Sequence, residues 1–318
     1  MNPDSRIYVA GHNGLVGSAL VRRCQAGGYT NLLTRERAQL DLRERAAVER
    51  FFASERPEYV FLAAAHVGGI HANDSQPADF IRDNLFIQTN LIDAAWRNGV
   101  RKLLFLGSSC IYPKHAAQPL REEYLLTGAL EPTNEGYAIA KLAGLKMCQA
   151  YRRQYGFNAI ALLPTNLYGP RDNFDLRTAH VLPALLRKIH NAQVTGADHV
   201  TIWGSGTPRR EFLYVDDLAD ACLFLMQRYD DEQPLNVGWG TDITIRELAQ
   251  ILARSIGFDG DFRFDASKPD GTPRKVLDVS RLTALGWKPS MPLESGVSIT
   301  HDWYRRNLAE VAPAATLA

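Results

Sequence analysis

The sequence has few cysteines, no long apolar run and no excess of charge of either sign. Its 318 residues include four cysteines without CxxC spacing, which argues against a zinc knuckle and a disulfide framework. With 36 Lys and Arg against 35 Asp and Glu, a net charge of +1 gives no general attraction to nucleic acid or to an anionic membrane. No segment is long and apolar enough to span a bilayer, and no apolar signal region stands at the start. We therefore expect a cytoplasmic protein that binds neither nucleic acid nor membrane.

Apolar runs alternate with helical patterns in the first half of the chain. Short apolar runs bounded by turn residues are typical of buried parallel strands, and stretches with helical spacing lie between them. The predicted strands are residues 7–10, 31–34, 59–63, 102–106 and 159–163, and the predicted helices are residues 15–25, 42–55, 80–98 and 137–155. This alternation predicts an α/β fold with a Rossmann-type, doubly wound parallel sheet.

After Pro164 the pattern loosens into loops rich in Gly, Pro, Arg and Asp, with shorter helical stretches at 215–226 and 244–256. We expect residues 1–164 to form mainly the Rossmann domain. Residues 165–308 are expected to form mainly a smaller C-terminal lobe that closes over a ligand, with some segments returning to the first domain. Residues 309–318 are expected to be a loosely held tail.

A glycine-rich turn follows the first predicted strand. It consists of Gly11, His12, Asn13, Gly14, Leu15, Val16 and Gly17. Glycines here allow a tight turn and let backbone amides and a helix N-terminus approach a pyrophosphate. Such glycines also occur merely to pack a helix on a strand, but a dinucleotide-binding fold has its turn at this place in the chain. The small alanine run at 63–65, after the third strand, suits close passage of the same cofactor.

The end of the second strand bears on which dinucleotide binds. A carboxylate there favours NAD, whereas a cation favours the 2′-phosphate of NADP. The segment carries Arg35 and Arg37 around Glu36, and these arginines would also fit a solvated surface. We predict NADP(H), with Arg35 near the 2′-phosphate and with Asp41 and Leu42 near the adenine.

Tyr137 and Lys141 lie four residues apart and therefore share one face of a predicted helix. Both can reach the same bound cofactor, and a nearby cation is expected to lower the pKa of the phenol. Alone, the pair would fit better an amphipathic helix with the tyrosine at its edge and the lysine in solvent. Ser108, after the fourth strand, adds a hydroxyl that can orient the same carbonyl, so the three predict a carbonyl-reducing site. Simple carbonyl reduction has no use for Cys110, two residues further on.

Longer segments carry a resemblance. The glycine turn, the serine after the fourth strand, the Tyr/Lys pair and the later run REFLYVDD are similar to the extended short-chain dehydrogenase/reductase superfamily, which acts largely on nucleotide sugars. The segments AAAHVGGI, LFLGSSCIYPK, LEPTNEGYAIAK, PTNLYGPRDNF, WGSGTPRREF and DASKPDGTPRK resemble the GDP-L-fucose synthase family, from the first strand to about Trp303. The resemblance implies epimerisation of GDP-4-keto-6-deoxy-D-mannose at C3 and C5, then reduction at C4 by NADPH. It also implies a homodimer.

The resemblance assigns roles residue by residue. It implies Cys110 as the base and His180 as the acid of epimerisation, while Tyr137 protonates the C4 oxygen and Lys141 holds the cofactor ribose. The further cofactor contacts that it implies are Pro164, Thr165, Asn166, Leu167 and His180, and the substrate contacts are Lys188, Trp203, Arg210 and Asp270. Asn13 stands where relatives can carry an arginine near the 2′-phosphate, so selectivity for NADP is expected to rest more heavily on Arg35, with Arg37 as a second candidate.

Other functions stay open on the sequence alone. Without the resemblance, a cysteine after a strand is more often a small buried apolar residue than a catalyst. A redox-neutral epimerase or a dehydratase with retained NAD would use the same fold but has no reason for Cys110 with His180. A plain 4-ketoreductase, the same chemistry on a GDP-linked 6-deoxyheptose or colitose precursor, and a non-catalytic dinucleotide sensor are further alternatives.

Overall fold

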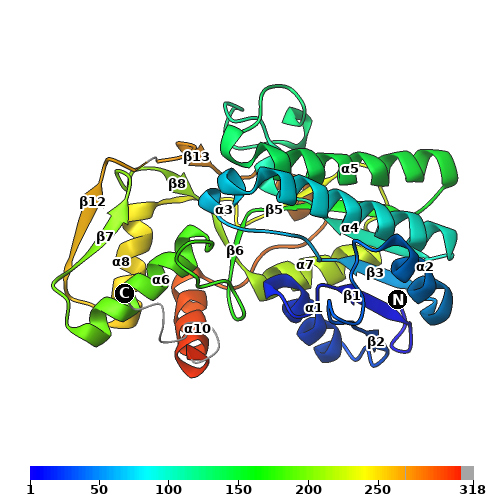
Figure 1. Ribbon diagram of the computed structural model, residues 1–318, viewed down its shortest axis with the longest axis horizontal. Coiled ribbons are helices and arrows are strands. Elements are labelled where there is room, and N and C mark those ends of the chain that lie inside the picture. Colours follow the sequence, from blue (N-terminus) through cyan, green and yellow to red (C-terminus); the bar gives the residue numbers. More distant parts are fainter. Residues whose placement is uncertain (269, 309–318) are drawn as a thin grey trace.

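A six-stranded parallel sheet with helices on both faces forms the larger part of the computed structural model, which describes residues 1–268 and 270–308 (Figure 1). The strands are β1 (Ile7–Ala10), β2 (Leu32–Leu33), β3 (Tyr59–Leu62), β4 (Lys102–Leu106), β5 (Ala159–Pro164) and β10 (Leu235–Val237). Their order is β2-β1-β3-β4-β5-β10, and every neighbouring pair is parallel. The predicted doubly wound α/β fold is confirmed. The predicted tail, 309–318, lies outside the described residues.

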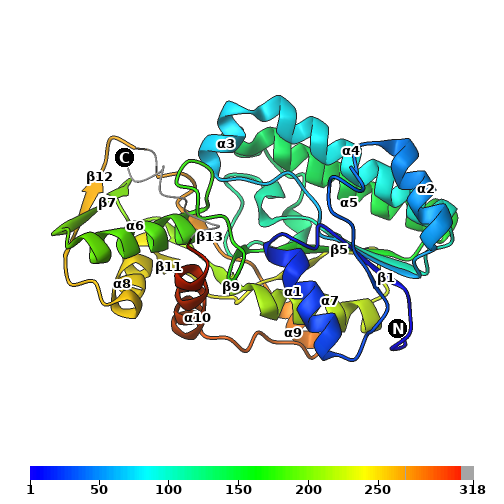
Figure 2. The ribbon, with the colours of Figure 1, turned by 60° about the horizontal axis from the view of Figure 1, so that its bottom comes forward.

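Alternate residues of the central strands point to opposite faces of the sheet. Tyr8, Val60 and Phe105 pack on one face, while Val9 and Phe61 pack on the other. Helices cover both faces, with α4 and α5 on one side and α1 and α7 on the other (Figure 2). Their bounds are α1 (Leu15–Ala26), α2 (Arg45–Glu55), α4 (Pro77–Arg97), α5 (Glu135–Tyr155) and α7 (Val215–Arg228). Burial on both faces explains why these strands are apolar throughout rather than alternating.

The smaller lobe surrounds a third hydrophobic core. Its longer elements are α6 (Val181–Thr195), β7 (His199–Trp203), α8 (Ile245–Ile256), β12 (Asp261–Asp265) and α10 (Leu293–Arg306). Its short strands are β6 (Asn166–Tyr168), β8 (Arg209–Arg210), β9 (Phe212–Tyr214), β11 (Ile243–Thr244) and β13 (Arg274–Lys275), and the short helices of the chain include α3 (Ile70–Ser75) and α9 (Ser280–Ala284). None of the helices among the described residues is long and apolar enough to cross a membrane.

The segment after β13 joins the lobe to the sheet domain. Leu120 donates its N–H to the carbonyl of Val276 and accepts from the N–H of Asp278, both at 2.8 Å. The fully buried Glu211 carboxylate accepts from the N–H of Leu277 at 2.9 Å and from that of Gly240 at 2.6 Å. These bonds hold β13 at the boundary between the two parts of the molecule.

Candidate active site

The glycine turn lies where the order of the sheet reverses, between β1 and β3. In an open α/β sheet, ligands bind at the carboxyl ends of the strands at such a switch point. Gly11 has a φ of +81°, and a Cβ there would lie 2.8 Å from the Cα of Ala64. No side chain caps the N-terminus of α1 within the part of the chain that the structure describes, so the amides of its first turn are left for a ligand. The residues present therefore fit a dinucleotide pyrophosphate.

The residues predicted near the adenosine end have protein partners. Arg35 pairs with Glu55, lies 5.4 Å from the centre of the Phe51 ring, and donates to the carbonyl of Thr34 at 2.8 Å. Asp41 accepts from Arg43 at 2.6 Å, and this hydrogen bond lowers the pKa of Asp41 to about 2. Leu42 is 9% exposed and packs in the core, where little of its side chain is left for an adenine.

Ser108, Tyr137 and Lys141 come together at the end of β4. Ser108 begins the 3₁₀ turn Ser109–Ile111, and its hydroxyl accepts from the N–H of Cys110 at 3.1 Å. Lys141 is buried on α5 and donates to the carbonyl of Leu106 at 2.9 Å, which ties the helix to the strand end. Its Nζ lies 5.8 Å from the centre of the Tyr137 ring. The Tyr137 hydroxyl is in turn hydrogen-bonded with Ser108, so the three side chains lie close together.

The expectation that Lys141 lowers the pKa of Tyr137 is wrong for this structure. Burial raises the pKa of Tyr137, the nearby Cys110 charge adds to this rise, and hydrogen bonding with Ser108 only partly opposes it. Burial also lowers the pKa of Lys141 to about 8. The cost of placing a phenolate in a buried site exceeds the attraction of a cation that already donates to a carbonyl. Tyr137 therefore stays protonated near neutral pH.

Cys110 receives a hydrogen bond from a lysine of the smaller lobe. The Nζ of Lys275 lies 3.3 Å from the partly buried Sγ of Cys110. Burial by itself would raise the pKa of Cys110, but the charges of Lys275 and Arg210 and the hydrogen bond with Ser108 outweigh it, and the pKa is lowered. A thiol in such surroundings is reactive, because its thiolate is stabilised.

His180 stands at the N-terminus of α6, and its side chain is exposed to solvent although many protein atoms surround it. Desolvation by the surrounding protein and the charge of Lys275 hold the pKa of His180 below its ordinary value. The ring is therefore neutral near pH 7 in the ligand-free protein. Lys275 acts on both residues that were predicted to share the epimerisation.

The predicted substrate contacts lie in the smaller lobe. Trp203 is 56% exposed, and the Nζ atoms of Lys188 and Lys268 each lie 5.5 Å from its ring centre. Asp270 is already bonded to the turn beside Trp203, because its carboxylate accepts from the N–H of Ser205 at 2.7 Å and from its hydroxyl at 2.9 Å. An exposed indole beside two ammonium groups suits a base and a diphosphate.

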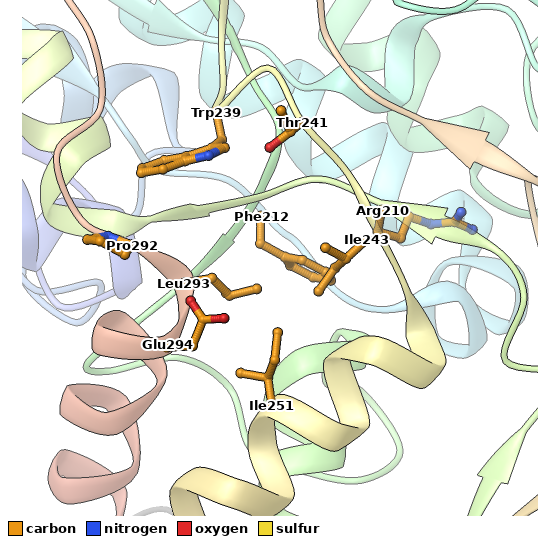
Figure 3. A pocket seen from close by; sticks show the side chains of 9 residues that line it. All are labelled: Arg210, Phe212, Trp239, Thr241, Ile243, Ile251, Pro292, Leu293 and Glu294. Atoms are coloured by element: carbon orange, nitrogen blue, oxygen red, sulfur yellow. The ribbon is translucent and has the colours of Figure 1, made fainter.

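A cavity of about 190 Å³ lies elsewhere in the smaller lobe (Figure 3). Phe212, Ile243 and Ile251 line its interior, and the guanidinium of Arg210 points away from them. None of the predicted catalytic residues lines it, so we do not place the chemistry there. Within residues 1–268 and 270–308 no group of three or more His, Cys, Asp or Glu side chains could hold a metal ion.

The sequence did not predict the contacts of Lys275, Lys268 and Glu211. Lys275, with Arg209, Arg210 and Arg274, was expected to form a local anion site rather than solvated surface charge, but its contact with Cys110 was not expected. Glu211 follows two arginines, and nothing in that local pattern indicates a fully buried carboxylate. A contact across 165 residues, as between Lys275 and Cys110, leaves no local signal.

Comparisons with known proteins identify the family. Residues 7–238 match the model of the NAD dependent epimerase/dehydratase family. GDP-L-fucose synthase 1 of Arabidopsis thaliana is 59% identical over 96% of this chain and 94% of its own. The structure of a GDP-6-OMe-4-keto-L-xylo-heptose reductase from C. jejuni is similar with a TM-score of 0.92 at 39% identity, covering 96% of this chain and 99% of that chain. A GDP-L-fucose synthetase from Naegleria fowleri bound to NADP is similar with a TM-score of 0.88 at 28% identity, covering 98% and 97%.

The family match makes the chain an enzyme that works with a nicotinamide cofactor. The identity to the Arabidopsis protein over nearly the whole of both chains narrows the assignment further. The chain belongs to the GDP-L-fucose synthase family, a branch of the NAD dependent epimerase/dehydratase family.

Proposed function

We propose that the chain converts GDP-4-keto-6-deoxy-D-mannose to GDP-L-fucose, by epimerisation at C3 and C5 and then reduction at C4 with NADPH. The observation that carries the proposal is a thiol of lowered pKa, Cys110, two residues from the serine of a Ser108, Tyr137 and Lys141 set. A ketoreductase needs the set but not the thiol. An epimerase that works next to a ketone needs both.

For the cofactor we propose NADP(H), which when bound supplies hydride to C4. The turn from Gly11 to Gly17 and the amides at the start of α1 would hold its pyrophosphate. Lys141 would hold its ribose, and the residues from Pro164 to Leu167 would contact its nicotinamide end. Arg35 would reach the 2′-phosphate by exchanging its Glu55 partner for that dianion. We expect NADPH, but not NADH, to raise the melting temperature of the protein.

In the epimerisation, Cys110 as a thiolate removes a proton from the carbon next to the ketone. The C–H bond breaks, an S–H bond forms, and the electron pair moves to the C4 oxygen, where Ser108 and Tyr137 donate hydrogen bonds. His180 then gives a proton to the opposite face. Its ring is neutral in the ligand-free protein, and the negative charge of the bound diphosphate and enolate raises its pKa so that it can act as the acid.

In the reduction, Tyr137 donates its proton to the C4 oxygen as the carbon accepts hydride. The raised pKa of Tyr137 keeps that proton in place until the oxygen becomes strongly basic. The buried Lys141 ammonium then lies beside the phenolate that is left. The substrate would be held through Trp203, Lys188 and Arg210, with Asp270 fixing the turn at Ser205 beside the indole.

The same chemistry on another GDP-4-keto sugar is the second candidate. The similarity to the structure of a heptose reductase favours it, but the identity there is 39%, against 59% for the GDP-L-fucose synthase 1 of Arabidopsis thaliana. Offering both sugars to the protein at equal concentration decides between them. A higher kcat/KM for the heptose would replace the hexose in our proposal.

The deciding experiment is NMR of GDP-4-keto-6-deoxy-D-mannose with the protein in heavy water, before and after NADPH is added. We expect deuterium at C3 and C5 first and a 6-deoxy-L-galactose product after NADPH. The Cys110→Ser variant is the control and should bind NADPH without exchanging deuterium, because a hydroxyl is a far weaker base than a thiol. Reduction without deuterium in the wild type would reduce the proposal to a plain 4-ketoreductase.

We further propose a cytoplasmic homodimer that pairs through α4 and α5. These two long helices lie side by side on one face of the sheet (Figure 1). Phe86 on α4 and Tyr155 on α5 are 50% and 43% exposed. Light scattering during size-exclusion chromatography tests it, and a monomer mass at micromolar concentration would contradict it. Cell fractionation tests the compartment.

A further inference from the structure

Lys275 reaches the thiol of Cys110 from the other part of the molecule. Cys110 follows β4 of the large sheet, whereas Lys275 ends β13 of the smaller lobe. Their 3.3 Å contact is the one hydrogen bond that the Lys275 ammonium makes among the residues the structure describes. The thiol and the ammonium therefore come from parts of the chain 165 residues apart, and the fold brings them together.

Strand register determines which cations of the smaller lobe face the thiol. β13 pairs with β8 so that Arg274 lies opposite Arg209 and Lys275 lies opposite Arg210. Residues directly opposite each other share a face, and successive residues alternate. Arg209 and Arg274 both pair with Asp242, at 2.8 Å and 2.5 Å. Lys275 and Arg210 are on the other face, where both act on Cys110.

The groups around the sulfur all favour negative charge on it. They are the Lys275 ammonium, the Arg210 guanidinium and the Ser108 hydroxyl, with the neutral Tyr137 phenol beyond. No carboxylate is among the main influences on the pKa of Cys110 within the described residues. Asp270 acts on the charge of the neighbouring Arg210 instead. Lys275 is also fixed in place, since the N–H of the next residue, Val276, donates to the Gln118 side chain at 3.0 Å.

We propose that Lys275 is the positioning residue that keeps the sulfur of Cys110 as a thiolate and holds it in place for epimerisation. The catalytic consequence rests on the proposed function. In the step itself the sulfur takes a proton from carbon, so an S–H bond forms and the electron pair passes to the C4 oxygen. Lys275 keeps its own proton and stabilises the anionic sulfur before the transfer. The base of the reaction is thus completed by a residue of the smaller lobe.

The test measures the thiol without any substrate. The rate of alkylation of Cys110 by iodoacetamide is followed from pH 5 to pH 10, and the modified residue is identified by peptide mass spectrometry. Cys24, Cys148 and Cys222 are buried, so Cys110 is the thiol that reagents reach. We expect a midpoint below about 8.5 in the wild type and one higher by about 1 pH unit or more in Lys275→Met. Near pH 7 this lowers the rate about tenfold.

Two variants separate charge from structure. Lys275→Arg keeps the charge and should restore most of the shift, whereas Arg274→Met removes the neighbouring cation that pairs with Asp242 and should leave the midpoint at the wild-type value. Equal midpoints in wild type and Lys275→Met would overturn the proposal. A wild-type midpoint at or above about 8.5 would also overturn the proposal, and this measurement does not depend on any variant folding correctly.

The outcome is independent of the proposed function. If the wild type exchanges deuterium into the keto sugar but Lys275→Met keeps the wild-type thiol midpoint, the role of Lys275 fails and the function stands. If the midpoint shifts but the wild type shows no exchange, the pairing stands and the function fails. When both hold, the pH profile of deuterium exchange in Lys275→Met should move to higher pH together with the alkylation profile.

Discussion

Replacing Gly17 by alanine should disrupt the cofactor turn more than any other single methyl group there. A Cβ at Gly17 would lie 2.0 Å from the carbonyl oxygen of Gly11 and 2.8 Å from the Cα of His12. Since real Cβ contacts are not found under 3.0 Å, α1 or the turn must move by at least the difference, 1.0 Å. The atoms in the way are backbone, so we take the upper end of overpacking costs, about 3 kcal/mol. At about 2 °C per kcal/mol, Tm falls by about 6 °C.

The same displacement should weaken NADPH binding. The amides at the start of α1 would move off the pyrophosphate, and losing one charge-assisted hydrogen bond costs about 1.5–3 kcal/mol, or about tenfold to hundredfold in Kd. Differential scanning fluorimetry and quenching of NADPH fluorescence measure the two effects. Gly14→Ala is the matched stability control, because its Cβ would lie 3.5 Å from the nearest atom at an ordinary φ of −77°. Wild-type Tm and Kd in Gly17→Ala, or an equal loss of Tm in Gly14→Ala, would refute the reasoning.

Three further variants test the roles of single titratable side chains, one in catalysis and two in stability. Tyr137→Phe should lower reduction at C4 by about 10²- to 10⁴-fold and deuterium exchange much less; equal losses would place Tyr137 in both half-reactions. Burial raises the pKa of Asp172 to about 7, so the stability that its protonated form contributes is lost as pH rises through 7. In urea unfolding, the free energy of unfolding of Asp172→Asn should rise relative to that of the wild type by about 2 kcal/mol or more between pH 5 and pH 8.5. Burial beside His190 lowers the pKa of His301 to about 4, so the free energy of unfolding should fall by up to about 3 kcal/mol as pH falls from 6.5 to 4. An equally steep loss of stability in His301→Gln would contradict this.

The sheet was largely predictable from the sequence because its strands are buried on both faces. Continuous apolar runs such as 102–106 stand out from the helices that flank them, and the strand there, β4, has the predicted bounds. β2 is shorter than predicted, with two residues instead of four, because an edge strand has one neighbour to pair with. β10 was not predicted. Its three residues are too few to show any period, and it joins the sheet only after the chain has returned from the smaller lobe.

The positions of the candidate site residues relative to one another were predictable where one element sets the spacing. Tyr137 and Lys141 share a helix face by periodicity alone, and Ser108 is near them because it follows a central strand. The expected pKa of Tyr137 was wrong because desolvation depends on every atom packed around the ring, which spacing does not reveal. The partners of Arg35 and Asp270 were likewise unpredictable, since Glu55 and Ser205 lie 20 and 65 residues away in the chain.

The sorting of cations on β8 and β13 explains how a nearly neutral chain makes a local anionic base. Alternation along the two strands places Arg209 and Arg274 against Asp242, where their charges are neutralised. It leaves Arg210 and Lys275 on the face of Cys110, so a one-residue slip of β13 would exchange Lys275 for an arginine already paired elsewhere. The fully buried Glu211, between β8 and β9, opposes that slip because its carboxylate accepts a hydrogen bond from the N–H of Leu277, two residues beyond Lys275. The acidity of the thiol therefore depends on strand register, which the hydrogen bonds of a carboxylate outside the reaction maintain.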